Sequence, residues 1–153
     1  MSKVKLLIAI KAPAEKVFPL VATAAGFSQW WAADVEETGD DVTLWFFKRS
    51  SCYKLQRTRA VAPGDAAATV GSPAGAVEWR CLNGQEWEGT RIIFELAENK
   101  GMTLVRFSHA DWKSETDYFT SCTTTWGELM FRLKAAAEGK TRGPLFSAGE
   151  MAY

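Results

Sequence analysis

The feature that most constrains the fold is a long amphipathic segment near the C-terminal end of the chain. From about residue 115 to residue 138, apolar side chains return every three or four positions, which is the period of one helix face. Gly139, directly after this segment, is typical of a helix end. A helix with such a stripe packs against another apolar surface. The stripe consists of Phe119, Cys122, Trp126, Leu129, Met130, Leu133 and Ala137.

The segments before this helix alternate apolar and polar residues, as half-buried β-strands do. In the first one, Val4, Leu6, Ile8 and Ile10 share one side. The clearest hairpin joins residues 90–97 to 102–109 through a turn at 99–101. Further strands are predicted at residues 33–37, 42–47, 53–61 and 76–82. The order predicts an α+β fold, in which a curved antiparallel sheet of six or seven strands wraps around the long C-terminal helix.

Two short helices are predicted between the first and second strands. Pro13 ends the first strand and suits the first turn of a helix over residues 13–22. Gly26 is expected to end that helix, and a second short helix with an aromatic face then contains Phe27, Trp30 and Trp31.

Length and charge narrow the class of protein. The chain has 153 residues, so we expect one domain over residues 1–153. Its 18 basic and 18 acidic side chains cancel, which argues against nucleic acid and anionic membranes as partners. The N-terminal segment has neither the apolar length of a membrane span nor a signal-peptide cleavage site. We therefore expect a cytoplasmic protein.

The three cysteines do not indicate a disulfide framework or a zinc site. Cys52, Cys81 and Cys122 are far apart, odd in number and never arranged as C-x-x-C. They are interpreted as reduced thiols that pack as small apolar residues.

Aromatic content is the unusual part of the composition, with seven tryptophans and nine phenylalanines. Some of these rings belong to the core, but so many in a small domain also predict the wall of a ligand cavity. The candidate cavity-lining residues, with the one histidine as a polar anchor, are Trp30, Trp31, Trp45, Trp79, Phe107, His109, Trp126 and Met130.

The sequence offers few catalytic groups. His109 is the only histidine, so any imidazole base must be this residue. It is interpreted first as a structural histidine near Trp112, and second as a group that faces the ligand. No three metal ligands have suitable spacing, and the common nucleophile and nucleotide motifs are absent. We therefore predict no catalytic residue, no metal and no cofactor.

Several local patterns resemble the START/SRPBCC superfamily, in the branch named after the activator of Hsp90 ATPase. They are the opening IAIKAPAEKVFPLVATAAGFSQWW, the segment Val77-Glu78-Trp79, residues 86–90, and residues 106–112 together with Cys122, Trp126 and Leu129. The resemblance spans nearly the whole chain and implies the helix-grip fold. Relative to this family, residues 66–76 look like an insertion, and the low-complexity loop 62–75 around it is expected to be mobile.

The leading functional hypothesis is that a small apolar or aromatic molecule binds between the C-terminal helix and the concave face of the sheet. One alternative is a cyclase-like or hydrolase-like enzyme that uses His109 with Asp111 or Glu88 in the same cavity. Another, less favoured because the chain has no second module to embrace a large partner, is a co-chaperone of an Hsp90-type protein. The sequence leaves a homodimer open.

Overall fold

The computed structural model describes residues 1–64, 74–140, 142–147 and 150–151. Residues 65–73 are not among them, so most of the predicted insertion (66–76) and of the predicted mobile loop (62–75) lies outside the described residues. The strands of the main sheet are β1 (Ser2–Ile10), β2 (Asp34–Thr38), β3 (Asp41–Phe46), β4 (Ser51–Val61), β5 (Gly75–Cys81), β6 (Arg91–Asn99) and β7 (Met102–Trp112). The other elements are α1 (Ala14–Ala22), α2 (Ala24–Phe27), α3 (Asp117–Ala137) and the short pair β8 (Phe146–Ser147) and β9 (Glu150–Met151).

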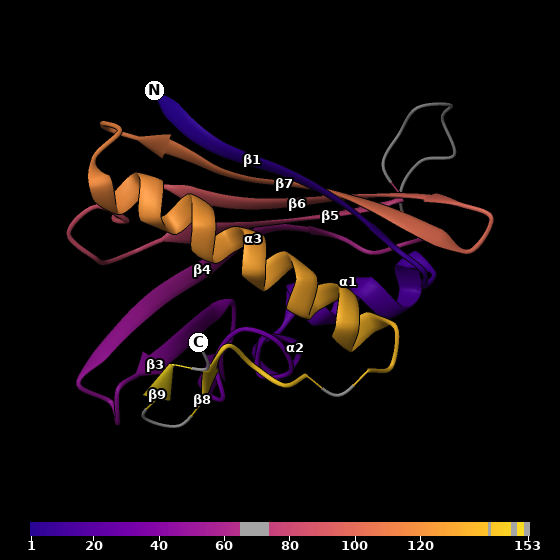
Figure 1. The fold of residues 1–153 in the computed structure, drawn as a ribbon, viewed down its shortest axis with the longest axis horizontal. Coiled ribbons are helices and arrows are strands. Elements are labelled where there is room, and N and C mark those ends of the chain that lie inside the picture. Colours follow the sequence, from indigo (N-terminus) through magenta and orange to yellow (C-terminus); the bar gives the residue numbers. More distant parts are fainter. Residues whose placement is uncertain (65–73, 141, 148–149, 152–153) are drawn as a thin grey trace.

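Seven antiparallel strands form one open sheet in the order β1-β7-β6-β5-β4-β3-β2. Strands β2 to β7 follow one another as a meander, and only β1 pairs out of sequence, beside β7. The predicted α+β fold, with a curved antiparallel sheet and a long C-terminal helix, is therefore confirmed. Figure 1 shows α3 lying obliquely across one face of this sheet, with α1 and α2 near its C-terminal end.

The core lies between α3 and the sheet because both elements present one apolar side. On β6, Ile92, Phe94 and Leu96 alternate with more exposed residues and are fully buried. On α3, the predicted stripe is buried from Cys122 to Ala137. Thr116 begins the helix by accepting a hydrogen bond from the Phe119 N–H (3.3 Å), and Gly139 ends it with a positive φ of 78°.

The break between α1 and α2 differs from the prediction. Gly26 does not end the first helix, because it lies inside α2. The chain instead turns at Thr23, whose backbone is extended and whose side chain accepts a hydrogen bond from the Gly26 N–H (2.9 Å). Trp30 and Trp31 follow α2 in a turn stabilised by bonds to the carbonyl of Phe27. The sequence signal at Gly26 therefore reflected packing rather than a helix end.

Gly26 is needed where α2 contacts α1. A Cβ atom at this position would lie 2.1 Å from the Pro19 carbonyl oxygen and 2.6 Å from the Leu20 Cα, both of which are backbone atoms. A backbone neighbour cannot move aside without shifting the helix. The tight packing of these two helices brings the turn with Trp30 and Trp31 under α3.

The segment after α3 was not predicted as a structural element. Leu145 and Phe146 donate backbone hydrogen bonds to the carbonyls of Trp30 (3.2 Å) and Trp31 (3.0 Å), and Ala33 donates to the carbonyl of Phe146 (2.9 Å). This segment therefore extends the tertiary structure beside the two tryptophans and places the Phe146 ring next to β3.

Two glycine substitutions test this packing. Gly26→Ala should lower the free energy of unfolding by at least about 2 to 3 kcal/mol, because the new methyl group meets backbone. Gly127→Ala lies inside α3, and no atom beyond its own stretch of helix is within 4 Å of the new methyl group, so it should raise the free energy of unfolding by about 0.5 to 1 kcal/mol. Urea unfolding of both variants measures the difference. Equal effects at the two positions would contradict the close approach of α1 and α2.

Candidate functional site

Most of the aromatic residues predicted to line a cavity are packed against one another. Trp30, Trp31, Trp79, Phe107 and Trp126 are each at most 2% exposed, and Met130 is also buried. The Trp126 ring lies 4.4 Å from the Phe107 ring and 4.9 Å from the Trp31 ring, measured between centroids. Trp30 and Trp79 donate their indole N–H groups to the carbonyls of Leu20 (2.8 Å) and Val21 (2.9 Å). Side chains therefore fill the centre of the space under α3.

Trp45 does not belong to this cluster, because strand alternation places it on the opposite face of the sheet. Its neighbours Leu44 and Phe46 are buried in the core, whereas Trp45 is only half-buried. The guanidinium of Arg49 lies 5.0 Å from the centroid of its ring. The expectation that Trp45 shares a cavity wall with Trp126 is therefore corrected.

His109 joins the sheet to α3 through a chain of buried hydrogen bonds. The indole N–H of Trp126 donates to Nδ1 of His109 (3.1 Å), and Nε2 of His109 lies 2.8 Å from the hydroxyl oxygen of Thr90. That hydroxyl in turn donates to the carbonyl of Trp87 (2.6 Å). Since Nδ1 accepts, the proton of the imidazole lies on Nε2. Every side-chain polar atom of this hydrogen-bond network therefore has a partner.

Burial without a carboxylate partner lowers the pKa of His109 to about 3, because the charged imidazolium would lose its hydration. The imidazole is therefore neutral at physiological pH. This arrangement agrees with the first interpretation of His109, a structural histidine near Trp112, whose ring centroid lies 4.7 Å away. A fully buried ring with both nitrogens engaged has no free position for a substrate.

The two carboxylates considered as catalytic partners of His109 lie elsewhere. An irregularity in the pairing of β1 and β7 gives β7 an extra residue between His109 and Trp112, and Asp111 there has a φ of 69°. Asp111 bonds Arg91 at 2.6 Å instead, and this contact lowers the pKa of the Asp111 carboxyl. Glu88 is exposed in a turn before β6. The enzyme hypothesis therefore has no assembled acid–base pair.

A hollow of about 230 Å³ lies at the N-terminal half of α3, and we call it the aromatic pocket. Its walls come from α3, from the β3–β4 hairpin, from the turns that carry Trp31 and Trp87, and from Phe146. Of the predicted residues, only Trp31 and Trp126 line it. The complete lining is Trp31, Phe46, Phe47, Ser51, Tyr53, Trp87, Tyr118, Ser121, Cys122, Thr125, Trp126, Leu129 and Phe146.

Aromatic stacking sets the shape of this pocket. The Tyr53 ring stacks on Trp87 with centroids 3.9 Å apart and an angle of 11° between the planes. Phe46 meets Tyr53 and Phe146 edge to face, at 5.5 and 5.1 Å. The hydroxyl groups of Tyr53 and Tyr118, which both line the pocket, are hydrogen-bonded to each other. No charged side chain belongs to the lining among the described residues.

The turn between β3 and β4 forms one lip of the aromatic pocket. Phe47, Lys48 and Arg49 have positive φ angles of 51°, 56° and 67°, a conformation that costs each non-glycine residue about 1 kcal/mol or more. Arg49 holds the turn by bonding Asp34 (2.9 Å) and Glu36 (2.8 Å) on β2. These ion pairs keep Phe47 and Ser51 at the rim of the pocket.

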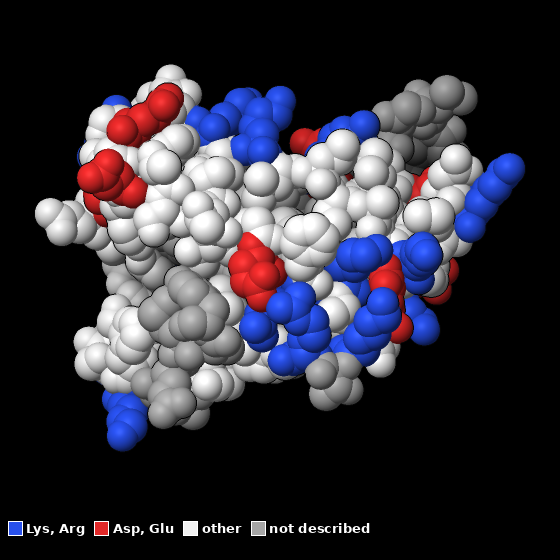
Figure 2. All heavy atoms as spheres, viewed as in Figure 1, with Lys and Arg blue, Asp and Glu red and all other residues white. Residues whose placement is uncertain are grey.

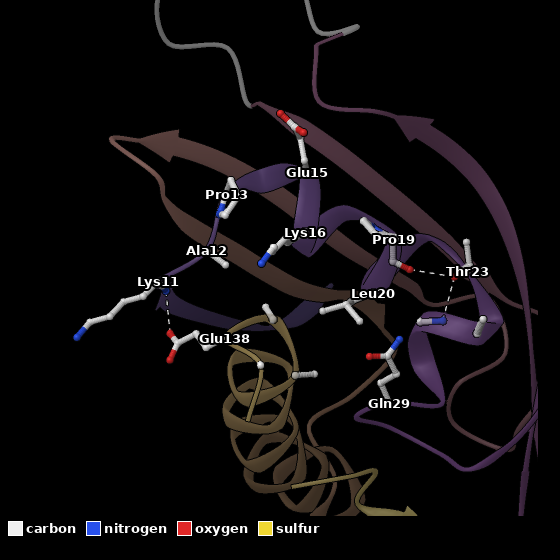
Figure 3. Close-up of a pocket in the computed structure, with 15 residues that line it drawn as sticks. Lys11, Ala12, Pro13, Glu15, Lys16, Pro19, Leu20, Thr23, Gln29 and Glu138 are labelled. Atoms are coloured by element: carbon white, nitrogen blue, oxygen red, sulfur yellow. Dashed lines mark hydrogen bonds between the residues drawn. The ribbon is translucent and has the colours of Figure 1, made fainter. Parts of the chain in front are cut away.

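A larger, open groove of about 580 Å³ lies between α1, α2 and the C-terminal end of α3 (Figure 3). Small and charged residues line it, and Glu138 accepts a hydrogen bond from the backbone N–H of Lys11 (2.7 Å) at one side. Figure 2 shows basic side chains gathered around this end of α3. Positive charge is favourable there, because the C-terminal end of a helix carries the negative end of its dipole. The groove has no enclosing wall and no aromatic ring, so the aromatic pocket is the better candidate site.

Sequence reasoning missed Phe46, Tyr53, Trp87, Tyr118 and Phe146 as pocket residues. A signal existed for Trp87, because the segment around it was recognised as a family motif. No signal existed for Phe146, because the backbone contacts that bring it to Trp31 join residues more than one hundred positions apart.

The described part of the chain offers little else of chemical note. No three His, Cys, Asp or Glu residues within it converge as metal ligands. None of its helices has the length and apolar character needed to cross a membrane. All three cysteines are free thiols, and burial raises the pKa of Cys81 to about 12.

Solved structures are similar to this chain over nearly its whole length. The Aha1 dimer from Colwellia psychrerythraea is 27% identical, with a TM-score of 0.71, 90% of this chain covered and 97% of that one. Protein SSP2350 from Staphylococcus saprophyticus is 16% identical, with a TM-score of 0.65 and coverages of 93% and 97%. CalU16 from Micromonospora echinospora is 14% identical, with a TM-score of 0.66 and coverages of 92% and 68%. No family model and no curated protein matches the sequence.

The protonation of His109 can be followed directly. Nitrogen NMR of the ring should show a neutral imidazole with its proton on Nε2 from pH 8 down to pH 5. Because the folded pKa of about 3 lies below the unfolded value of about 6.5, the unfolded chain takes up the proton first. His109 therefore lowers stability as the pH falls from about 6.5 towards 3. A titration midpoint near 6.5 in the folded protein would contradict the buried network.

The bond between Trp126 and His109 can be removed by substitution. Trp126→Phe keeps a ring but leaves Nδ1 of His109 without its donor, so the free energy of unfolding should fall by about 1 to 3 kcal/mol. Trp126→Ala should cost about 3 to 5 kcal/mol, as for other large buried rings. Trp45→Phe is the control, since its indole N–H has no partner among the described residues. If chemical denaturation shows the same loss in free energy of unfolding for Trp45→Phe as for Trp126→Phe, the network is refuted.

Proposed function

We propose that this chain, which has the helix-grip fold of the START/SRPBCC superfamily, binds a small apolar or aromatic molecule in the aromatic pocket, and that it does so in the cytoplasm. One observation carries the proposal: an uncharged, ring-lined hollow of about 230 Å³ lies between α3 and the sheet. Ligand sites of small molecules are commonly apolar hollows with a few polar groups at fixed positions.

The size of the hollow limits the ligand. An engineered cavity of about 150 Å³ in another protein accommodates benzene, so a pocket of about 230 Å³ suits a molecule of one or two rings. Larger lipids would extend beyond it. The rings around the pocket are braced by Trp87, which stacks with both Tyr53 and Trp126, so the site is formed before a ligand arrives.

A catalytic role in the same pocket is less well supported. It depended on His109, and that ring is fully buried, neutral and bonded at both nitrogens. The pocket lining contains hydroxyl groups and the Cys122 thiol, whose pKa is raised by burial. A protonated thiol is a weak nucleophile.

A role with an Hsp90-type chaperone is the second candidate, because the chain is 27% identical to the Aha1 dimer from Colwellia psychrerythraea. A homodimer is consistent with the same similarity. Neither role requires the aromatic pocket, so a test of the pocket separates them from ligand binding.

Substitution of two neighbouring threonines tests the proposal. Thr125 lines the pocket and Thr124 is exposed beside it, so Thr125→Phe should fill the hollow and Thr124→Phe should not. A neutral one- or two-ring compound at about 100 times its Kd should raise the Tm of the wild type by about 5 to 10 °C. We expect Thr124→Phe to keep this shift and Thr125→Phe to lose it.

Thermal unfolding with a library of neutral aromatic compounds, followed by calorimetric titration, gives the measurement. Absence of any shift in the wild type across the library would refute ligand binding. An equal shift in Thr125→Phe would place the ligand outside the aromatic pocket.

A further inference from the structure

We propose that the ligand of the aromatic pocket is an uncharged planar aromatic molecule with a hydroxyl group, and that the paired hydroxyls of Tyr53 and Tyr118 select it. This inference rests on the proposed function and names the ligand class. It follows from three properties of the pocket: its charge, its polar groups and the shape of its walls.

The pocket offers no charge to a charged ligand. No Lys, Arg, Asp or Glu residue is part of its lining among the described residues. Two cations follow Phe47 in the β3–β4 turn: Arg49 is bound to Asp34 and Glu36 on β2, and Lys48 is exposed and outside the lining. A carboxylate entering the pocket would lose its hydration and gain no partner of opposite charge. An ammonium group would gain contacts with ring faces but no carboxylate partner within the lining.

A carboxylate lies just outside the pocket and strengthens this selection against anions. Glu86 borders a separate hollow of about 240 Å³ that shares Tyr53 and Tyr118 with the aromatic pocket, and it accepts a hydrogen bond from Thr116 (2.5 Å). Burial is the main cause that raises the pKa of the Tyr53 hydroxyl and of the Cys122 thiol, and the negative charge of Glu86 adds to both shifts. An anionic ligand at the tyrosine pair would meet the same repulsion.

The polar groups that line the pocket are mainly hydroxyls, from Ser51, Tyr53, Tyr118, Ser121 and Thr125. Each tyrosine hydroxyl has one donor and two acceptor positions, and the bond between Tyr53 and Tyr118 uses one donor and one acceptor. One O–H group of the pair therefore remains to donate, and acceptor positions remain beside it. Burial raises the pKa of both tyrosines, so both stay protonated. A ligand hydroxyl can donate to this pair and accept from it.

The walls match a flat ring. Tyr53 is fixed parallel to Trp87, and Phe46 and Phe146 present rings at steep angles to their neighbours, 73° for Phe46 and Tyr53 and 88° for Phe46 and Phe146. Aromatic ligands gain from stacked and edge-to-face contacts with such walls, beyond the gain from burial alone. Because stacking also fixes the Tyr53 ring, its hydroxyl keeps one position relative to the ligand plane.

Four compounds of similar size provide the test: naphthalene, 2-naphthol, 2-naphthoate, and a naphthyl compound with a trimethylammonium group. Calorimetric titration at pH 7 should show that 2-naphthol binds roughly 3- to 10-fold more tightly than naphthalene, as one added net hydrogen bond allows. The naphthoate and the ammonium compound should bind at least about 10-fold more weakly than 2-naphthol. Tighter binding of either charged compound would overturn the proposal.

The tyrosine pair is tested by removing both hydroxyls. In the double variant Tyr53→Phe with Tyr118→Phe, the affinity ratio of 2-naphthol to naphthalene should fall to about one. Thr123→Val is the control, because it removes a hydroxyl from the same helix outside the pocket lining. The control should keep the wild-type ratio.

The outcomes separate this inference from the proposed function. If naphthalene and 2-naphthol bind equally well and Thr125→Phe abolishes both, the pocket binds ligands but the hydroxyl selection is wrong. If the double tyrosine variant keeps the preference for 2-naphthol, the tyrosine pair is not the selecting group. If none of the four compounds nor any neutral aromatic of the library binds the wild type, the proposed function itself fails.

Discussion

The structure depends on one buried contact between helix and sheet, the hydrogen bond from the Trp126 indole to His109. It joins the middle of α3 to β7, and the Thr90 hydroxyl continues it to the turn that carries Trp87. A buried donor or acceptor without a partner would cost about 1 to 3 kcal/mol, so these groups hold one another in a single arrangement. Apolar packing alone tolerates small shifts of a helix relative to a sheet. Hydrogen bonds are directional, so this network defines one position for α3.

The position of α3 also decides where the protein is hollow. Trp31 and Phe107 pack against Trp126, Trp30 stacks on Trp31, and these buried rings fill the space beneath the middle of the helix. Towards the N-terminal end of α3, the wall is formed instead by the β3–β4 hairpin, whose turn has three positive φ angles and is bonded to β2 through Arg49. The aromatic pocket therefore lies where the tight packing beneath the middle of the helix gives way to this hairpin.

The same packing leaves the single histidine buried and without a free ring nitrogen. Its neighbours Trp87, Trp112 and Trp126 exclude water, and each nitrogen is engaged. The strand β7 has an extra residue between His109 and Trp112, and Asp111 in this stretch does not bond His109 but forms an ion pair with Arg91. An imidazole and a carboxylate two positions apart in sequence therefore serve two unrelated structural roles.

The sequence by itself determined the strands, the long helix and their order, because periods of two and of about 3.6 residues are local properties of the chain. It also predicted that Trp31 and Trp126 face the core, since their spacing is that of helix faces, and both line the aromatic pocket in the structure. Only the tertiary structure decided that Gly26 serves helix packing, that Trp45 faces outward from the cluster, and that Tyr53, Tyr118 and Phe146 meet at one pocket. The physical reason is distance along the chain: a pocket is the space left between elements, and its shape depends on contacts between residues that no local pattern connects.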